Sequence, residues 1–350
     1  MSAFTRLRLE NFTVFTEFDQ EFSPGLNVFI GKNGTGKTHL LKLLYTSAAI
    51  TIGRDRELGF TVKLCNTFSP HQMDVSRLIR QQRNMVNSSI QIYRDLDLGI
   101  EAIISEDKLT LNQYHSDKGK EWNELNKWTD VPMEPVFIPV KEMLSHAPGF
   151  LALFERRDLR FEDVYADIIR KAYIPALREP LMKEHLDKLQ MLEEIMSGRI
   201  VQKDEAFFLD GRQGDIEFPL LSEGMRKLGL IWILIRNGSI SRDSVLFWDE
   251  PEANLNPELI RSVVHLMLMF QRQGTQIFIS THNYIVLKEI DLLANHDDQI
   301  KFFSLYKGED GDISCHTASN FLSLQHNAIT EKFDDLYDRE IIRQFGRPTQ

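Results

Sequence analysis

The sequence has little cysteine, no long apolar run and no excess of positive charge. Its two cysteines, Cys65 and Cys315, have a spacing that fits neither a disulfide framework nor a metal site. Its longest apolar runs, such as residues 230–235, are far shorter than the roughly 20 residues that cross a bilayer. The N-terminus alternates polar and apolar residues and lacks the pattern of a secretory signal. We therefore expect a cytoplasmic protein with two free thiols.

The charge balance is acidic. The formal net charge is −10, from 41 lysines and arginines against 51 aspartates and glutamates, which argues against a surface that attracts nucleic acid over its whole extent. A local strip is present in residues 76–84, where Arg77, Arg80 and Arg83 recur every three residues and would share one side of a helix. A solvated helical face is the simpler interpretation, with nucleic-acid binding as the alternative.

The first part of the chain has the pattern of short strands around one helix. Alternating residues predict three strands between residues 4 and 30, and a helix follows at 38–46. Residues 60–114 combine β-rich runs, among them 60–68, with the arginine-bearing helix, so we expect a β-rich lobe. Residues 133–140 predict a compact buried strand beside prolines.

The later part changes from helices to an alternating pattern. Residues 161–200 carry apolar residues at three- and four-residue spacing, which predicts helices. Beyond residue 219, strands and helices alternate, as is typical of a parallel sheet. The expected elements are a helix at 223–236, a strand at 245–248, a helix at 257–271 and a strand at 276–280.

The stretch GKNGTGKT, residues 31–38, matches the phosphate-binding pattern G-x-x-x-x-G-K-[ST] between a predicted strand and a predicted helix. Gly34 and Gly36 permit backbone conformations that turn successive N–H groups inward at the positive end of the helix. Lys37 adds a positive charge for the β- and γ-phosphates, and the Thr38 hydroxyl is suited to bind Mg²⁺. We therefore expect this loop to bind a nucleoside triphosphate with magnesium.

The stretch SVLFWDE, residues 244–250, ends an apolar strand in two carboxylates. We expect Asp249 at the magnesium and Glu250 beside the γ-phosphate, where it would activate the attacking water. Consecutive strand residues point in opposite directions, so the two carboxylates can take separate roles.

Two more stretches are candidates for phosphate contact. In LSEG, residues 221–224, Ser222 is either a simple N-cap or part of a second anion site with the helix N-terminus. His282 follows the predicted strand at 276–280, where a neutral imidazole would reach the γ-phosphate.

These motifs, in this order, resemble those of the ATP-binding cassette ATPases. More narrowly, LRLENFTVF…GLNVFIGKNGTGKT and EPEANLNP resemble the soluble SMC, RecF and OLD-like branch, of AAA_21 and AAA_15 type. The resemblance covers residues 1–50 and 215–285. It implies an α/β fold, a P-loop NTPase of ABC-ATPase type with an N-terminal antiparallel β lobe and a helical insertion.

The resemblance also implies a mechanism. Two heads meet head to tail, each ATP is held by one head's phosphate loop and the other head's LSEG stretch, and hydrolysis separates them. The implied catalytic residues are Lys37, Glu250 and His282, and the implied magnesium ligands are Thr38 and Asp249. The residues implied to bind ATP are Gly31, Lys32, Asn33, Gly34, Thr35, Gly36, Lys37, Thr38, His39, Ser222, Glu223 and Gly224.

Three departures qualify the resemblance. Asn256 stands where many cassette ATPases have aspartate, which is closer to the OLD-like form. The expected glutamine loop is not evident; residues 139–145 are the best candidate, although Lys141 and Glu142 could equally be a surface pair. Too few residues follow His282 for a Toprim nuclease domain, so we expect a head without that domain and, if a nuclease is involved, a separate chain.

The tail predicts a helix with Ile329, Phe333, Leu336, Tyr337 and Ile341 at helical spacing. This stripe either packs on its own domain or docks a second chain. The expected organisation is 1–145 as the first part of the ATPase head with the β-rich lobe, 146–214 as a helical insertion, 215–325 as the second part of the head, and 326–350 as the C-terminal helix.

These features favour an ATPase switch that forms homodimers, or higher oligomers, and regulates a separate effector in bacterial anti-phage defence or genome maintenance. The effector would be a nuclease or another toxic protein. One alternative is the energising subunit of an ABC transporter, against which stand the N-terminal LENF stretch, the long separation of Lys37 from Asp249 and EPEANLNP. The other is a RecF-like DNA-repair module, which a strong basic surface would favour.

Overall fold

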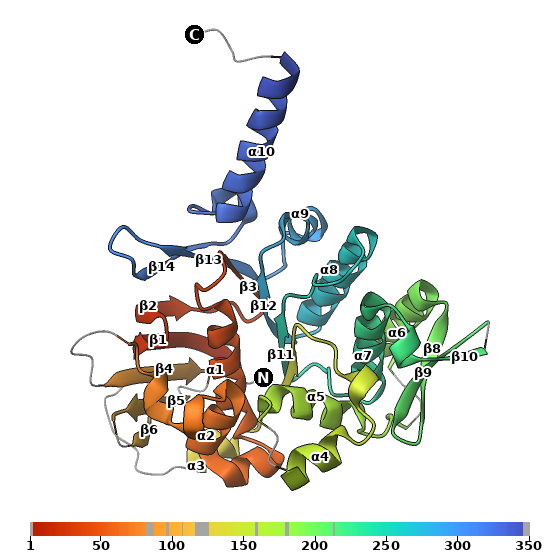
Figure 1. The fold of residues 1–350 in the computed structure, drawn as a ribbon, viewed down its shortest axis with the longest axis horizontal. Helices are drawn as coiled ribbons and strands as arrows, with labels where there is room; N and C mark the ends of the chain where they lie inside the picture. Colours follow the sequence, from red (N-terminus) through yellow and green to blue (C-terminus); the bar gives the residue numbers. More distant parts are fainter. Residues whose placement is uncertain are drawn as a thin grey trace.

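Two large sheets organise the chain (Figure 1). The computed structural model describes residues 3–81, 87–95, 98–106, 108–115, 126–157, 160–178, 182–212 and 214–345. The first sheet is antiparallel, in the order β2-β1-β4-β5-β6. Its strands are β1 (Phe4–Phe12), β2 (Phe15–Glu21), β4 (Ser88–Arg94), β5 (Leu98–Ile104) and β6 (Leu109–His115).

The second sheet has the order β14-β13-β3-β12-β11-β7, and only its edge strand β14 runs antiparallel. Its strands are β3 (Leu26–Gly31), β7 (Glu134–Ile138), β11 (Ser244–Asp249), β12 (Gln276–Thr281), β13 (Ile300–Lys307) and β14 (Ile313–Ala318). Because parallel strands end at the same edge, Gly31, Asp249 and Thr281 are brought to one side of the sheet. This edge carries the candidate site.

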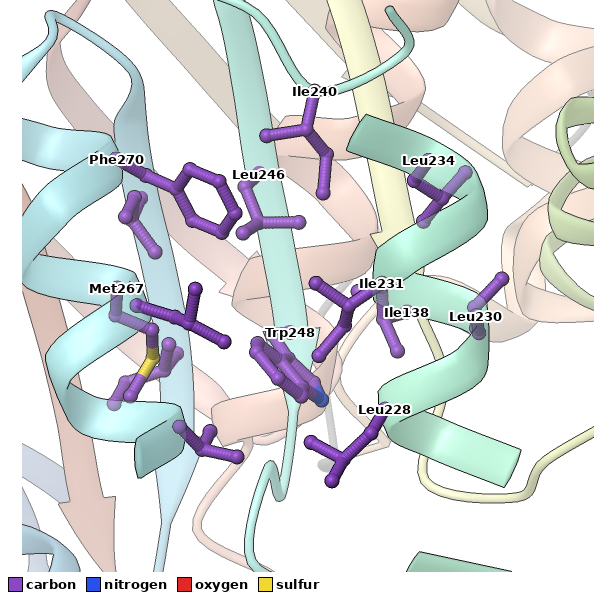
Figure 2. Packing of buried hydrophobic residues seen from close by; sticks show 14 of the residues in the cluster. Ile138, Leu228, Leu230, Ile231, Leu234, Ile240, Leu246, Trp248, Met267 and Phe270 are labelled. Carbon is purple, nitrogen blue, oxygen red and sulfur yellow. The ribbon is translucent and has the colours of Figure 1, made fainter. Parts of the chain in front are cut away.

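Helices cover both faces of the parallel sheet. On one face α1 (Lys37–Ala49), α2 (Gly53–Phe68) and the antiparallel sheet share a core with Phe247 of β11 and Phe278 of β12, whose rings are stacked at 5.3 Å. On the other face lie α7 (Glu223–Arg236), α8 (Pro257–Arg272) and α9 (Tyr284–Leu293). Figure 2 shows Trp248 of β11 between Ile231 of α7 and Met267 of α8. Strand β11 is thus buried on both sides, as its unbroken apolar run requires.

Smaller elements surround this body. They are α3 (Asn126–Asp130), α4 (Phe150–Arg157), α5 (Asp163–Ala172), α6 (Lys183–Met196), a sheet of β8 (Gly198–Lys203), β9 (Ala206–Gly211) and β10 (Gly214–Glu217), and α10 (Ala328–Phe345). Helix α10 projects away from the body (Figure 1). At its base Phe333 stacks on Tyr284 of α9 at 4.3 Å, whereas Tyr337 is 66% exposed, so only the first part of the predicted stripe packs on this chain.

Most strongly patterned elements are confirmed. The three N-terminal strands, the helix after the phosphate loop, the strand within 133–140 and the four elements between 223 and 280 all form. The prediction for residues 60–68 was wrong, because they belong to α2. Phe60 and Leu64 lie four residues apart on its buried side, a helical period that the β-branched neighbours Thr61 and Val62 obscured.

The arginine-bearing helix was also predicted wrongly. Residues 75–78 form only a short 3₁₀ turn, after which the chain is extended, and Arg83 lies outside the described residues. Arg80 forms an ion pair with Asp312 at 2.5 Å, so it is not a free member of a basic strip.

Several elements were not predicted. Residues 161–200 do hold two helices, α5 and α6, but the neighbouring segment folds into the β8–β9–β10 sheet. Helix α9 and strands β13 and β14 were also missed. Within the described residues both cysteines are free, and no helix is long and apolar enough to cross a membrane.

Candidate nucleotide-binding site

The phosphate loop joins the end of β3 to the start of α1. Its glycines have positive φ angles, 149° at Gly31, 80° at Gly34 and 92° at Gly36. A Cβ atom at Gly36 would lie 2.6 Å from the ring of Phe15 and 2.7 Å from Val14, whereas one at Gly34 would meet open space. Gly36 is therefore required by both conformation and packing, and Gly34 by conformation alone. The loop lies against the β1–β2 turn.

Lys37 is enclosed by the loop that it follows. Its Nζ donates to the carbonyl oxygens of Gly31 at 2.8 Å and Lys32 at 3.1 Å, and the residue is buried. Burial lowers the pKa of Lys37, and the nearby carboxylates of Glu250 and Asp249 oppose that shift. The ammonium thus lies inside the loop with neutral partners.

Thr38 and Asp249 meet directly across the sheet edge. The Thr38 hydroxyl donates to the Asp249 carboxylate at 2.9 and 3.1 Å, and the Ser280 hydroxyl donates to the same carboxylate. Burial raises the pKa of Asp249, while the hydrogen bonds from Ser280 and Thr38 counteract it. A hydroxyl and one carboxylate, completed by phosphate oxygens and water, form the kind of oxygen set that Mg²⁺ accepts.

Among the described residues no group of three or more His, Cys, Asp and Glu side chains could hold a metal by itself. Thr38 and Asp249 supply oxygen ligands on two sides of one position, and these fit a magnesium ion that arrives with a nucleotide. They do not form a separate metal centre of the all-protein kind.

Glu250 adopts an unusual backbone conformation directly after β11. Its φ angle is 47°, in the left-handed region that residues with a Cβ rarely occupy. Its N–H donates to Ser280 O at 3.1 Å and Ser280 Oγ at 3.2 Å, and its Oε1 lies 3.2 Å from His282 Nδ1. The structure thus brings Glu250 and His282 together at the edge that also holds Asp249.

Glu252 is a buried member of this site that the sequence analysis did not single out. It accepts from Thr281 Oγ1 at 2.6 Å and from the N–H of His282 at 3.3 Å, and burial raises its pKa. Ser280, which contacts both Asp249 and Glu250, was missed as well. The stretch DEPE, residues 249–252, carries a third carboxylate beside the two that were singled out, and this pattern could have indicated Glu252.

The LSEG stretch lies at the start of α7, away from the phosphate loop in sequence and beside a different loop in space. Ser222 is the N-cap, and its hydroxyl accepts from Met225 N at 3.4 Å. A Cβ atom at Gly224 would lie 3.2 Å from Leu255 and 3.3 Å from the Asn254 carbonyl oxygen. Ser222 is thus an N-cap within its own chain, as one of the two interpretations expected. That Ser222 also binds ATP remains a prediction.

The residues after β7 do not form a surface pair. Glu142 has a fully buried side chain, pairs with Arg226 of α7 at 3.0 Å and accepts from Ser145 Oγ at 2.9 Å, whereas Lys141 is exposed. The surface interpretation of Lys141 and Glu142 was therefore wrong for Glu142. The ion pair between Glu142 and Arg226 attaches α7 to residues 139–145, the segment expected to act as the glutamine loop.

Two features border the loop. His39 faces Phe68, with ring centroids 5.6 Å apart, and burial lowers its pKa to about 4, so the imidazole is neutral at pH 7. A cavity of about 700 Å³ lies along Lys32 and Thr35, and Arg77, Tyr306 and the start of α10 contribute to its walls. Its size is within the range of small-molecule sites.

Two family models match the sequence. One, described as an AAA domain, matches residues 6–195, which is more than half of the chain. The other, described as "AAA domain, putative AbiEii toxin, Type IV TA system", matches residues 139–288.

Curated relatives match over short stretches. The DNA replication and repair protein RecF of Streptococcus suis is 33% identical over 87 residues, which are 25% of this chain and 23% of that protein. RecF of Streptococcus uberis is 50% identical over 50 residues, 14% of each chain. The chain thus matches less than a quarter of the length of these relatives.

Solved structures resemble the whole chain at low identity. The Smc head domain of Pyrococcus furiosus, bound to the C-terminal domain of ScpA, superposes with a TM-score of 0.56 at 14% identity and covers 98% of this chain and 100% of that one. The Smc head domain of Pyrococcus yayanosii gives 0.59 at 10% identity, with coverage of 96% and 100%. The expected fold is confirmed, and the chain belongs to the AAA domain family of P-loop ATPases with the fold of an SMC head.

Proposed function

We propose that this protein is an ATPase whose heads pair on ATP, and that the pairing controls a separate effector. The observation that carries the proposal is the direct contact of Thr38 with Asp249 beside Glu250 and His282. A phosphate loop, a magnesium ligand pair and a candidate base thus share one sheet edge. This is the arrangement that phosphoryl transfer to water needs, because catalysis there depends on positioning and charge stabilisation.

Each residue has a distinct proposed role. The Gly31–Gly36 backbone and Lys37 bind the phosphates, Thr38 and Asp249 hold magnesium, and His39 lies at the loop's helical end. Magnesium, when bound with ATP, supplies positive charge against the phosphate oxygens. Glu250 accepts a proton from the attacking water, and His282 orients the Glu250 carboxylate through the 3.2 Å contact.

Head pairing is proposed from the position of Ser222. It caps the N-terminus of α7, whose partial positive charge suits a phosphate, and Gly224 of the same turn packs against Asn254 and Leu255. A second copy, presenting Ser222, Glu223 and Gly224 to the bound ATP, would complete each site. The likeness to SMC heads supports a fold on which this arrangement can be built.

The effector is proposed to be a separately encoded toxic protein, such as a nuclease. The family that matches residues 139–288 is itself described as "putative AbiEii toxin, Type IV TA system", a toxin of a toxin–antitoxin system, which fits a defence role. The nucleotide state would change whether two heads are joined, and an effector that binds only one state is thereby switched.

Glu250→Gln tests the chemistry and the pairing together. Turnover should fall by about 100- to 10,000-fold because a proton acceptor is lost, while ATP binding persists and pairs accumulate. Light scattering with ATP and magnesium measures the pairs. Combining Glu250→Gln with Ser222→Arg should abolish the pairs without preventing ATP binding. The control combines Glu250→Gln with Ser323→Arg, at an exposed residue, and should still form pairs. Unchanged turnover in Glu250→Gln, or pairs that persist in the Ser222→Arg double variant, would refute the corresponding role.

A RecF-like DNA-binding module is the second candidate. The local similarity to RecF proteins favours it, and the net charge of −10 does not. Fluorescence anisotropy with labelled double-stranded DNA, with and without ATP, decides between the two. ATP-dependent binding that weakens steeply with salt would support the DNA module.

A further inference from the structure

Lys227 is a buried cation on the second turn of α7, the helix that begins after Ser222. The residue is 2% exposed, and its Nζ donates to the carbonyl oxygen of Ala253 at 2.6 Å. Burial lowers the pKa of Lys227, while the carboxylates of Glu223 and Glu252 oppose the shift. Enclosing an ammonium with a neutral partner costs stability, so Lys227 is not explained by a contribution to stability. Its contacts indicate a functional role instead.

The partner of Lys227 belongs to the turn that holds Glu250. Ala253 N donates to Glu250 O at 3.0 Å, while Ala253 O accepts from Lys227. Glu250 has the left-handed conformation described above, which persists only where the surroundings hold it. Lys227 is therefore connected through Ala253 to Glu250, the residue proposed to activate water.

The first turn of α7 touches the same loop. Gly224 approaches Asn254 and Leu255 so closely that a Cβ atom would be tight against both. Gly224 and Lys227 are thus two points on one helix that both contact residues 253–255, and Ser222 caps the same helix. A small displacement of the N-cap therefore reaches the Glu250 turn without any intervening flexible segment.

We propose that Lys227 is a positioning residue that links the two ATP sites of a head pair. When Ser222 binds the ATP of the partner head, α7 and Lys227 move as one and set Glu250 of their own chain in place. The inference rests on the proposed head pairing. Hydrolysis at one site then depends on ATP at the other, so turnover is cooperative in ATP.

The test measures initial ATPase rates against ATP concentration for the full chain. Wild type should show a Hill coefficient of about 2, the limit for two coupled sites. Lys227→Met should lower it to about 1 and reduce turnover by about 10-fold or more, because Glu250 is less well placed. Lys227→Arg, which keeps a charged donor, should retain the cooperativity of the wild type. ATP-dependent pairing in light scattering should be unchanged in both variants.

Lys188→Met is the matched control. Lys188 is equally buried, on α6, and burial lowers its pKa to about 8, yet it donates to Glu184 and Gln273, away from the Glu250 turn. Its loss should leave the Hill coefficient unchanged. If Lys227→Met fails a thermal-melting check, Lys227→Gln replaces it with the same expectation.

Four outcomes are decisive. Cooperative turnover in Lys227→Met would overturn the proposal, and so would an equal loss of cooperativity in Lys188→Met. A wild type that pairs on ATP but hydrolyses it without cooperativity would overturn the link alone. A wild type that neither pairs nor hydrolyses ATP would contradict the proposed function itself.

Discussion

Lys37 and Lys63 are both buried, and the structure surrounds them in opposite ways. Lys37 donates to two neutral carbonyl oxygens, and its pKa is lowered by burial. Lys63 lies 2.9 Å from Asp55, 3.3 Å from Asp163 and 2.5 Å from Asp167. Burial alone would lower the pKa of Lys63 too, but the three carboxylates outweigh it and raise the pKa.

The difference separates a ligand site from a structural one. Around Lys63 the ammonium is paired with carboxylates inside the protein, and Tyr45 donates to Asp167 at 2.7 Å as well. The cluster fastens α1 and α2 to α5 beside a cavity of about 520 Å³. Lys37 instead donates to two backbone carbonyl oxygens, so its positive charge remains available for phosphate oxygens. Both lysines are buried, yet only Lys37 lies at the candidate site. Burial of a lysine therefore does not by itself identify a ligand site.

Lys63→Met should have the largest effect on stability. Removing the cation leaves three carboxylates close together in a poorly hydrated place, which should lower the free energy of unfolding by about 3–5 kcal/mol. Denaturant unfolding measures the loss. Lys171→Met is the control, because its pair with Glu134 is more exposed and should contribute about 0–1 kcal/mol. Equal losses in the two variants would show that the Lys63 cluster is not special.

Lys37→Ala should have the next largest effect, and on binding. Losing charged hydrogen bonds to phosphate should weaken ATP binding by about 100-fold or more. Unfolding stability should change little, because the lysine's present partners are carbonyl oxygens of a loop. Equilibrium binding of a fluorescent ATP analogue measures this, with Lys301→Ala on β13 as the control. Retained affinity would remove Lys37 from the site.

Tyr45→Phe should have the smallest effect. It removes one buried hydrogen bond to Asp167, which keeps Lys63 and Arg170 as partners, so the loss should be about 1 kcal/mol. Tyr173→Phe, which removes an exposed bond to Glu205 O, should cost less. Denaturant unfolding compares the two. A loss near that of Lys63→Met would mean that the hydroxyl, rather than the ammonium, holds the cluster together.

The most strongly patterned elements could be predicted because their cause is local. A glycine loop between a strand and a helix, and an apolar strand that ends in DE, are short patterns whose geometry follows from a few neighbouring residues. The helix at 60–68 could not be read correctly, since its β-branched residues favour strands and its helical side shows only in contact with the lobe. The β8–β10 sheet has a different explanation, because its strands pair with their neighbours along the chain and its short strand patterns were not recognised.

The sequence by itself determined the phosphate loop, its lysine and threonine, and the order of strands and helices that make an α/β ATPase. Only the tertiary structure decided that Thr38 contacts Asp249 across 211 positions, that Glu142 is buried against Arg226, and that Lys227 reaches the turn of Glu250. The physical reason is that motif patterns record local conformation. Burial, charge matching and hydrogen-bond partners are set by segments that meet only when the sheet assembles.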